Sequence, residues 1–214
     1  MNRDKNGGNT MKMNSDIEKM LKDVVKRVSA ARPPLQCVHF ENGNAVVTDS
    51  HRLVKVKDIA PKDLNLDLNL ADFSFPDIDY PNTDRLIPKE FTTKLTLAKA
   101  DVVAMLPSLK AMATEYFGKR RVVKLNVSEE NFKVSRTDSS TQSVQTVDFT
   151  PSRFSGEVIE LSCDARYLAD AFEALTKIKD TRIQTFELKI NTDLTPFLIS
   201  TVNIDYLLTP VRVF

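Results

Sequence analysis

Apolar and polar residues alternate along this chain with two periods, one typical of helices and one typical of strands. Between residues 15 and 31 the apolar positions lie three or four residues apart, at Ile17, Met20, Leu21, Val24, Val25 and Val28. This spacing predicts a helix with one apolar face. Ser15 followed by Glu18 fits a capping box, so we expect the helix to begin at Ser15, after a short strand over residues 10–14.

The segment after this helix alternates with the period of strands. We expect strands over residues 35–41, 45–49 and 51–58, with Asn42-Gly43 as the hairpin turn between the first two. Another alternating run predicts a strand within residues 64–73. The residues from there to Phe91 are rich in proline and have no helical period, which predicts an extended connector.

The same order of one strand, one helix and three strands then returns twice. The second copy is expected to have strands over 93–99, 121–127, 131–136 and 143–149, and the third over 157–163, 185–190, 196–201 and 206–214. The helix of the second copy covers residues 100–113, with Val102, Val103, Leu106 and Leu109 expected to face inward. Pro107 is expected to kink or split it. The helix of the third copy covers residues 164–178, with Asp164 as its cap.

Three copies of one βαβββ unit indicate an α+β repeat architecture, in which single units are seldom stable alone. We therefore divide the chain into a disordered leader over residues 1–10, one unit over 11–70, a connector over 71–92 and a two-unit domain over 93–214.

Composition narrows the class of protein only slightly. The formal net charge is +1, so any nucleic-acid partner must be recognised by the distribution of charge rather than by its total. Cys37 and Cys163 stand far apart with no nearby cluster of metal ligands, which predicts buried thiols in a reducing cytoplasm and no metal site. No apolar run approaches the roughly 20 residues of a membrane span, so we expect a cytoplasmic protein without a membrane partner.

Asp49, Ser50 and His51 are the residue types of a hydrolase triad. A triad usually assembles from distant segments, however, and adjacent residues in a turn point in different directions. There is also no G-x-S-x-G elbow, P-loop or dinucleotide-binding glycine motif in the chain. A polar hairpin turn is the plainer interpretation, and we expect neither catalysis nor a cofactor.

Four motifs resemble the bacterial DNA polymerase III beta subunit, the sliding clamp. "VVTDSHRLV" is similar to the family's A-T-D-G-H-R-L-A turn, and "FPDIDYPNTDRLIP" to its F-P-D-Y-x-x-x-(I/L)-P connector. "IELSCDARYLADAFEAL" is similar to the I-x-F-N-x-x-Y-L-x-D-A-L helix entry of its last domain, and "YLLTPVRVF" to its C-terminus. The family has six βαβββ halves per chain, whereas three are counted here. This chain has Ser50 where the family has a glycine, and Thr209 where the family has a methionine. The smaller number of halves and these two replacements suggest a truncated or phage-like relative.

The resemblance implies the α+β DNA-clamp fold and a cleft between the middle and last domains that binds partner peptides rich in Leu, Phe and Gln. The cleft residues carried over are Leu35, Thr48, Ser50, His51, Arg52, Leu53, Pro76, Leu86 (or Ile87), Pro196, Phe197, Leu207, Leu208, Thr209, Pro210, Val211 and Arg212. An apolar slot with a polar rim suits capture of an extended peptide. For Phe197, Leu207 and Leu208, packing in the core is an equally good interpretation.

The resemblance also implies that basic side chains on the helices contact the phosphates of double-stranded DNA without reading its sequence. The candidates are Lys19, Lys22, Lys26, Arg27, Lys99, Lys110, Lys119, Arg120, Arg121, Arg166, Lys177 and Lys179. For any single lysine, a solvated helix face is the alternative. No aromatic residues interleave with these charges along the sequence, which argues against a platform for stacked single-stranded bases.

Together these features predict a non-catalytic processivity factor of DNA replication that tethers polymerase and clamp-loader peptides and forms a ring of several copies. With three units per chain, four copies would supply the twelve units of the family's rings. The alternative is a monomeric, clamp-like regulatory module that binds such peptides without encircling DNA.

Overall fold

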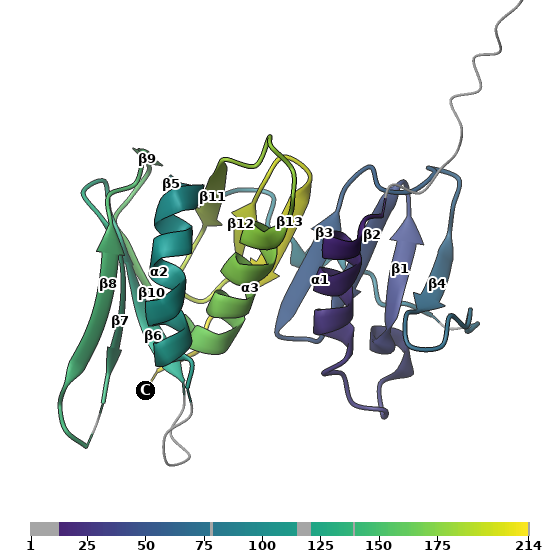
Figure 1. The fold of residues 1–214 in the computed structure, drawn as a ribbon, viewed down its shortest axis with the longest axis horizontal. Coiled ribbons are helices and arrows are strands. Elements are labelled where there is room, and N and C mark those ends of the chain that lie inside the picture. Colours follow the sequence, from purple (N-terminus) through teal and green to yellow (C-terminus); the bar gives the residue numbers. More distant parts are fainter. Residues whose placement is uncertain (1–12, 78, 115–120, 139, 214) are drawn as a thin grey trace, which may run out of the picture. The chain divides into compact units, whose positions relative to one another are not determined.

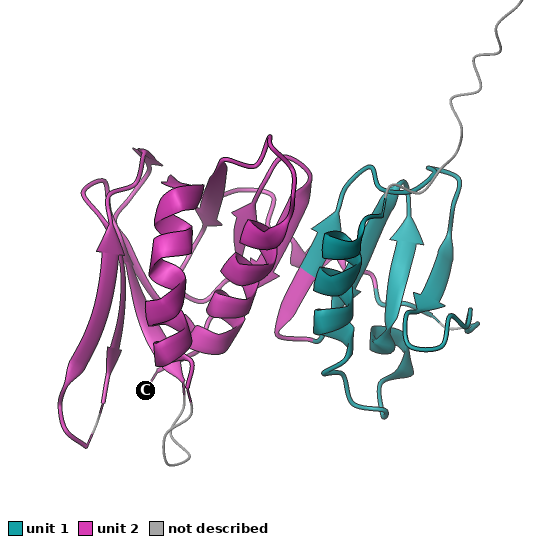
Figure 2. Cartoon of the chain, in the orientation of Figure 1, with its two compact units in different colours: residues 1–49, 54–81 teal, residues 50–53, 82–214 magenta. Residues whose placement is uncertain are grey.

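The structure, a computed structural model, describes residues 13–77, 79–114, 121–138 and 140–213. They form two compact units (Figure 2). Unit 1 comprises Met1–Asp49 and Val54–Pro81, and unit 2 comprises Ser50–Leu53 and Asn82–Phe214. Residues 50–53 thus group with unit 2 although unit 1 surrounds them in the sequence. The expected leader over residues 1–10 lies outside the described residues.

Unit 1 is an antiparallel sheet with one helix packed on it (Figure 1). Its elements are α1 (Ser15–Val25), the 3₁₀ helix η1 (Pro33–Gln36), β1 (Cys37–Glu41), β2 (Asn44–Thr48), β3 (Arg52–Val56) and β4 (Leu66–Asn69). The first two residues of β3 group with unit 2. The strands lie in the order β4-β1-β2-β3. Asn42 and Gly43 turn the β1–β2 hairpin with φ angles of 52° and 83°, as their sequence predicts. The apolar stripe of α1 is buried against β1 and β2.

The capping residue and the end of α1 differ from the prediction, while its first residue is Ser15 as expected. Asn14, not Ser15, is the N-cap, because its side-chain oxygen accepts hydrogen bonds from the backbone N–H groups of Asp16 and Ile17. After Val25 the helical hydrogen-bond pattern ends, because the N–H groups of Arg27 and Val28 donate to carbonyl groups only three residues back, at Val24 and Val25. Of the strand predicted over residues 10–14, Met13 and Asn14 are described and belong to no strand.

Unit 2 holds two antiparallel sheets and two helices that lie side by side (Figure 1). The sheets have the strand orders β10-β6-β7-β8 and β13-β12-β11-β5-β9. Its elements are η2 (Asp84–Leu86), β5 (Thr93–Ala98), α2 (Lys99–Met112), β6 (Val122–Val127), β7 (Phe132–Thr137), β8 (Val144–Phe149), β9 (Arg153–Ser155), β10 (Ile159–Asp164), α3 (Ala165–Lys177), β11 (Thr185–Ile190), β12 (Phe197–Ser200) and β13 (Ile204–Leu208).

The two repeats of unit 2 exchange their first strands. β5, which begins the second repeat, pairs with β11 of the third, so that Leu95 lies opposite Leu188. β10, which begins the third repeat, pairs with β6 of the second, so that Leu161 lies opposite Leu125. Each sheet is completed by the other repeat, which explains physically why one repeat alone would leave an unpaired strand edge.

The inward face of α2 was partly mispredicted. Val102 and Leu109 are buried, but Val103 is 50% exposed and Leu106 is only half-buried. Met105 and Met112 take the buried positions instead, because they continue the spacing of three and four residues from Val102. The helix is continuous through Pro107, which is exposed, so water can reach the carbonyl group that proline leaves without a helical donor.

The strands β9 and β13 also differ from the expected set of strands. β9 was not predicted, since three residues are too few to show an alternation. β13 was expected over residues 206–214 but covers Ile204–Leu208. The chain leaves the sheet after Leu208 because Thr209 bonds to His51 and Pro210 has no N–H group to donate.

Both cysteine thiols are buried and free. Burial raises the pKa of Cys163, and burial followed by the nearby charges of Asp67 and Asp72 raises the pKa of Cys37. Since the thiolate is the reactive form, we expect no reaction of the native protein with a thiol reagent near pH 8, and two reactive thiols in urea. A thiol that reacts quickly in the native protein would contradict this burial.

Candidate functional site

The turn between β2 and β3 is anchored to the residue that follows β13. The carbonyl oxygen of His51 accepts a hydrogen bond from the backbone N–H of Thr209 at 3.0 Å and another from its hydroxyl at 2.9 Å. Ser50, one residue earlier, is exposed and has a φ of 77°, in the left-handed region. The turn therefore has a defined shape, fixed from within unit 2.

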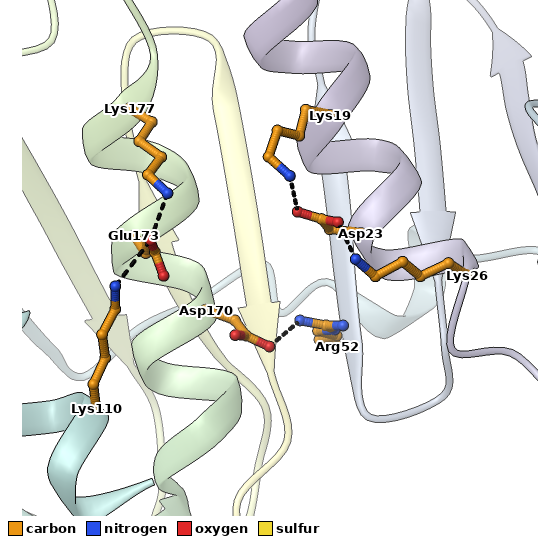
Figure 3. A network of polar contacts seen from close by, with 8 residues as sticks. All are labelled: Lys19, Asp23, Lys26, Arg52, Lys110, Asp170, Glu173 and Lys177. Atoms are coloured by element: carbon orange, nitrogen blue, oxygen red, sulfur yellow. Dashed lines mark hydrogen bonds and ion pairs between the residues drawn. The ribbon is translucent and has the colours of Figure 1, made fainter. Parts of the chain in front are cut away.

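The guanidinium group of Arg52 is buried beneath this turn. Its Nη1 donates to a carboxylate oxygen of Asp170 at 3.0 Å (Figure 3). The same nitrogen donates to the hydroxyl of Tyr206 at 3.1 Å. Its side chain is 1% exposed, whereas that of Asp170 is 28% exposed. The centre of the guanidinium lies 5.1 Å from the ring centroid of Tyr167, within the range of a cation–π contact. Arg52 thus joins the turn to α3 and β13.

Tyr167 also contacts His51 on the surface of unit 2. The two rings are stacked, with centroids 5.6 Å apart and planes inclined by 17°. His51 is exposed and Tyr167 is half-buried, so part of this stacked pair is accessible at the surface. Sequence reasoning did not select Tyr167 or Asp170, although both stand in "IELSCDARYLADAFEAL", one of the motifs that carry the resemblance.

The other predicted cleft residues fall into three groups. Leu35, Thr48 and Pro76 belong to unit 1. Within unit 2, four apolar side chains lie in the core with at most 3% exposure, namely Leu53, Phe197, Leu207 and Leu208. The accessible ones are Leu86, which is 47% exposed, Ile87, Pro196, Thr209, Pro210 and Val211, which are half-buried, and Arg212, which is exposed.

A pocket of about 570 Å³ opens beside the C-terminal segment of unit 2. The segment lies against β10, since the N–H of Val211 donates to the carbonyl of Ser162 at 2.7 Å. The pocket is lined by Lys124, Glu160, Leu161, Ser162, Asp193, Leu194, Val211, Arg212 and Val213. Two predicted residues, Val211 and Arg212, therefore border a concave surface with both apolar and charged walls.

The predicted basic row on α1 is matched by acidic residues of the same helix. Lys22 pairs with Glu18 at 2.6 Å, and Lys19 and Lys26 both pair with Asp23 (Figure 3). Burial raises the pKa of Asp23, but hydrogen bonds from Lys26 and Lys19 outweigh it and hold that pKa below its ordinary value. Exposed pairs of this kind are worth about 1 kcal/mol or less, so a phosphate can replace the carboxylate.

The basic candidates of unit 2 gather mainly on α2 and α3. Lys110 and Lys177 share Glu173, at 2.9 Å and 2.5 Å, and Lys177 followed by Lys110 lowers its pKa against the effect of burial (Figure 3). Lys99 donates to the carbonyl of Ile178 at 3.4 Å, and Arg121 lies 3.8 Å from Asp164. Arg166 is half-buried on α3, and Lys179 is exposed. Of the predicted basic residues of unit 1, Arg27 is exposed as well. Lys119 and Arg120 lie outside the described residues.

Two other kinds of site are absent from the part of the chain that the structure describes. No group of three or more His, Cys, Asp or Glu side chains there could hold a metal ion. None of the described helices is long and apolar enough to span a bilayer.

Comparison with known proteins identifies the family. A family model described as the DNA polymerase III beta subunit, C-terminal domain, matches residues 84–212, more than half of the chain. This chain belongs to that family. The beta sliding clamp of Synechococcus elongatus is 26% identical over 139 residues, which is 64% of this chain and 35% of that protein.

Solved clamp structures share the fold. The DNA polymerase sliding clamp of Bacillus subtilis superposes with a TM-score of 0.75 at 21% identity, covering 92% of this chain and 62% of that chain. The Helicobacter pylori beta clamp bound to a DNA ligase peptide superposes with a TM-score of 0.71 at 18% identity, covering 92% and 63%. The α+β clamp fold predicted from the sequence is thus confirmed, while the chain spans less than two thirds of these relatives.

Family membership also answers the question raised by Asp49, Ser50 and His51. The beta subunit family is one of non-catalytic processivity factors, in agreement with the prediction that the chain is not an enzyme. The turn is better described by its contacts with Thr209 and Tyr167 than as the start of a hydrolase triad.

Replacing Ser50 with glycine is expected to raise the free energy of unfolding by up to about 1 kcal/mol, because glycine adopts a φ of 77° without the steric penalty of a Cβ. The gain is partly offset by the greater freedom of glycine in the unfolded chain. Urea denaturation measures the difference. The matched control is Ser155→Gly in strand β9, which should lower the stability, and equal losses at both positions would contradict the strained turn.

Proposed function

We propose that this clamp-family chain is an accessory subunit of DNA replication that holds a polymerase or another partner through a short peptide. The observation that carries the proposal is the family match over residues 84–212, the part of the chain that contains Tyr167, Asp170 and Thr209. The Helicobacter pylori clamp, which shares the fold, is known with a DNA ligase peptide bound. A peptide is therefore the expected ligand of this chain as well.

The peptide would lie on unit 2, across the turn of residues 50–53 and along the C-terminal segment. The stacked rings of His51 and Tyr167 supply an apolar surface, and the half-buried Pro210 and Val211 extend it toward the 570 Å³ pocket. Arg52, Asp170 and Thr209 act as positioning residues, because they fix the turn without exposing much surface of their own. Side chains such as Leu and Phe would be buried here, while polar groups at the rim set the direction of the peptide.

Contact with duplex DNA is proposed for the exposed lysines of α2 and α3. Lys110 and Lys177 share a single carboxylate, so this pair carries a surplus positive charge. Attraction to phosphates without readout of bases is what a protein that slides along DNA needs. We further propose that several copies form a ring, for which four copies would supply twelve repeats.

Replacing both Lys110 and Lys177 with alanine is expected to weaken binding to duplex DNA and to lower the slope of log affinity against log salt by about 2, since each phosphate contact contributes about 0.9. A titration of labelled duplex DNA from 50 to 200 mM salt measures the slope. Lys189→Ala on β11, where the lysine pairs with Glu187, is the control. An unchanged slope in the double variant would exclude these two lysines from the DNA contact.

A second candidate function is a monomeric, clamp-like module that binds partner peptides without encircling DNA. The pairing of Lys19, Lys22 and Lys26 with carboxylates of the same helix favours it, because phosphates of DNA would have to displace two carboxylates there. Native mass spectrometry with nicked circular DNA separates the two functions. A ring predicts an oligomer that stays on circular DNA in high salt and is released when the circle is cut, whereas a strictly monomeric species would leave only the second function.

A further inference from the structure

A second concave surface lies on unit 1, and it shares no residue with the peptide site proposed for unit 2. This pocket, which we call the α1 pocket, has a volume of about 500 Å³. It is lined by Lys22, Val25, Lys26, Val28, Gln36, Asn69, Leu70 and Ala71. Its walls come from the last turn of α1, the residues after it, η1 and the end of β4, all within unit 1.

Phe73 contacts Lys22, one of the residues that line the α1 pocket, and has an unusual backbone conformation. Its ring is 62% exposed, and the ammonium group of Lys22 lies 5.7 Å from the ring centroid. Its φ is 58°, in the left-handed region that costs a residue other than glycine about 1–2 kcal/mol. The residue is largely exposed, so among the described residues its packing offsets little of this strain.

The loop that holds Phe73 is stabilised by its own hydrogen bonds. The N–H of Phe73 donates to the carbonyl of Asn69 at 2.8 Å, and the N–H of Asn69 donates to the carbonyl of Ser74 at 3.0 Å. The side chain of Asp72 accepts bonds from the N–H and the hydroxyl of Ser74, at 3.0 Å and 2.7 Å. The exposed ring is therefore presented by a defined turn, which lowers the entropy that a ligand would lose on ordering it.

The chemistry of the α1 pocket selects one kind of ligand. Val25 and Leu70 form an apolar floor with at most 8% exposure, while the side chains of Lys22 and Lys26 at the rim are 41% and 58% exposed. The ion pairs of these lysines with Glu18 and Asp23 are exposed and weak, so carboxylates of a ligand can replace them. The rim thus complements negative charge and the floor complements an apolar side chain.

We propose that the α1 pocket and Phe73 bind a short peptide segment of a partner protein in which a bulky apolar side chain is flanked by Asp or Glu. The apolar side chain enters the pocket against Val25 and Leu70 and packs on Phe73, and the acidic residues bind Lys22 and Lys26. A concave apolar floor favours such a peptide over single-stranded nucleic acid, whose bases need an open aromatic face. Lys22 already occupies one face of Phe73. This inference does not depend on the peptide site proposed for unit 2.

The test is fluorescence anisotropy of the full chain with a labelled probe peptide that carries Leu-Phe between two pairs of Asp and Glu. We expect saturable binding that weakens at least tenfold in Lys22→Glu/Lys26→Glu and at least fivefold in Phe73→Gly. Glycine adopts the φ of residue 73 without strain, so Phe73→Gly should remain folded, as circular dichroism will verify. The matched control is Val158→Ser, which removes an exposed apolar side chain of unit 2.

Four results would overturn the proposal. The first is no binding of the probe, and the second is equal binding of a peptide in which Ala-Ala replaces Leu-Phe, since the contact would then be one of charge alone. The third is a loss in Tyr167→Ala as large as in Phe73→Gly, which would place the probe on unit 2. The fourth is Phe73-dependent binding of a thymidine oligonucleotide that displaces the probe, which would make the surface a site for single-stranded nucleic acid.

Discussion

Asp170→Ala is expected to lower the free energy of unfolding of unit 2 by about 3 kcal/mol, because it removes the carboxylate to which the buried guanidinium of Arg52 donates. The side chain of Arg52 is 1% exposed and bonds to Asp170 at 3.0 Å. The hydroxyl of Tyr206 and the ring of Tyr167 stay beside the guanidinium, but neither can replace the negative charge of Asp170. The loss is therefore expected to exceed that from any exposed ion pair of the chain.

Urea denaturation followed by circular dichroism measures this loss, since the chain has no tryptophan to report on unfolding. The matched control is Glu173→Ala, one turn further along α3, where the carboxylate pairs with two exposed lysines. The control should lose about 1 kcal/mol or less. The double variant Arg52→Met/Asp170→Leu should recover most of the stability, because it removes the buried charge of Arg52 together with its partner. Equal losses in Asp170→Ala and Glu173→Ala would show that Arg52 does not depend on Asp170.

Tyr167→Ala is expected to weaken binding of a short peptide rich in Gln, Leu and Phe at least tenfold. The ring centroid of Tyr167 lies 5.6 Å from that of His51 and 5.1 Å from the centre of the Arg52 guanidinium. Removing the ring therefore takes away apolar surface and also loosens the turn. Aromatic side chains at the centre of an interface often contribute about 2 kcal/mol or more to binding. His51→Ala should weaken binding less, because His51 is the more exposed of the two rings.

Fluorescence anisotropy with the labelled peptide compares these variants. Tyr167→Phe keeps the ring and should bind within about threefold of the unsubstituted chain. Phe73→Gly on unit 1 is the second control and should bind this peptide unchanged. Full affinity in Tyr167→Ala, with the protein folded, would remove Tyr167 from the proposed peptide site.

The fold was predictable where the sequence has a clear period. The strands β11 and β7 and the helix α3 with its Asp164 cap follow their patterns closely, because one face of each is apolar. The buried face of α2 was not predictable, since apolar residues occur all round it and Val103 is as apolar as Met105. The exchange of β5 and β10 between repeats was not predictable either, because pairing between residues at least 32 positions apart in the sequence leaves no local signal.

The sequence indicated which positions belong to the candidate site, but not what each side chain does there. The turn at Ser50 and the segment at Thr209 were selected through the resemblance, and the hydrogen bonds from Thr209 to His51 join them. Leu53, Phe197, Leu207 and Leu208 belong to the core, a distinction that apolarity alone cannot make. The carboxylate partners of the lysines on α1 could have been read from the spacing of Glu18 and Lys22, four residues apart on one helix face.

The central claim is that the turn of residues 50–53, α3 and the C-terminal segment together bind a partner peptide, and amide chemical-shift mapping by NMR tests it most directly. The peptide rich in Gln, Leu and Phe is titrated into the isotopically labelled chain. The largest saturable shifts are predicted at His51, Tyr167, Thr209 and Val211, with little change at Phe73. An absence of shifts at these four residues, or shifts confined to unit 1, would contradict the account.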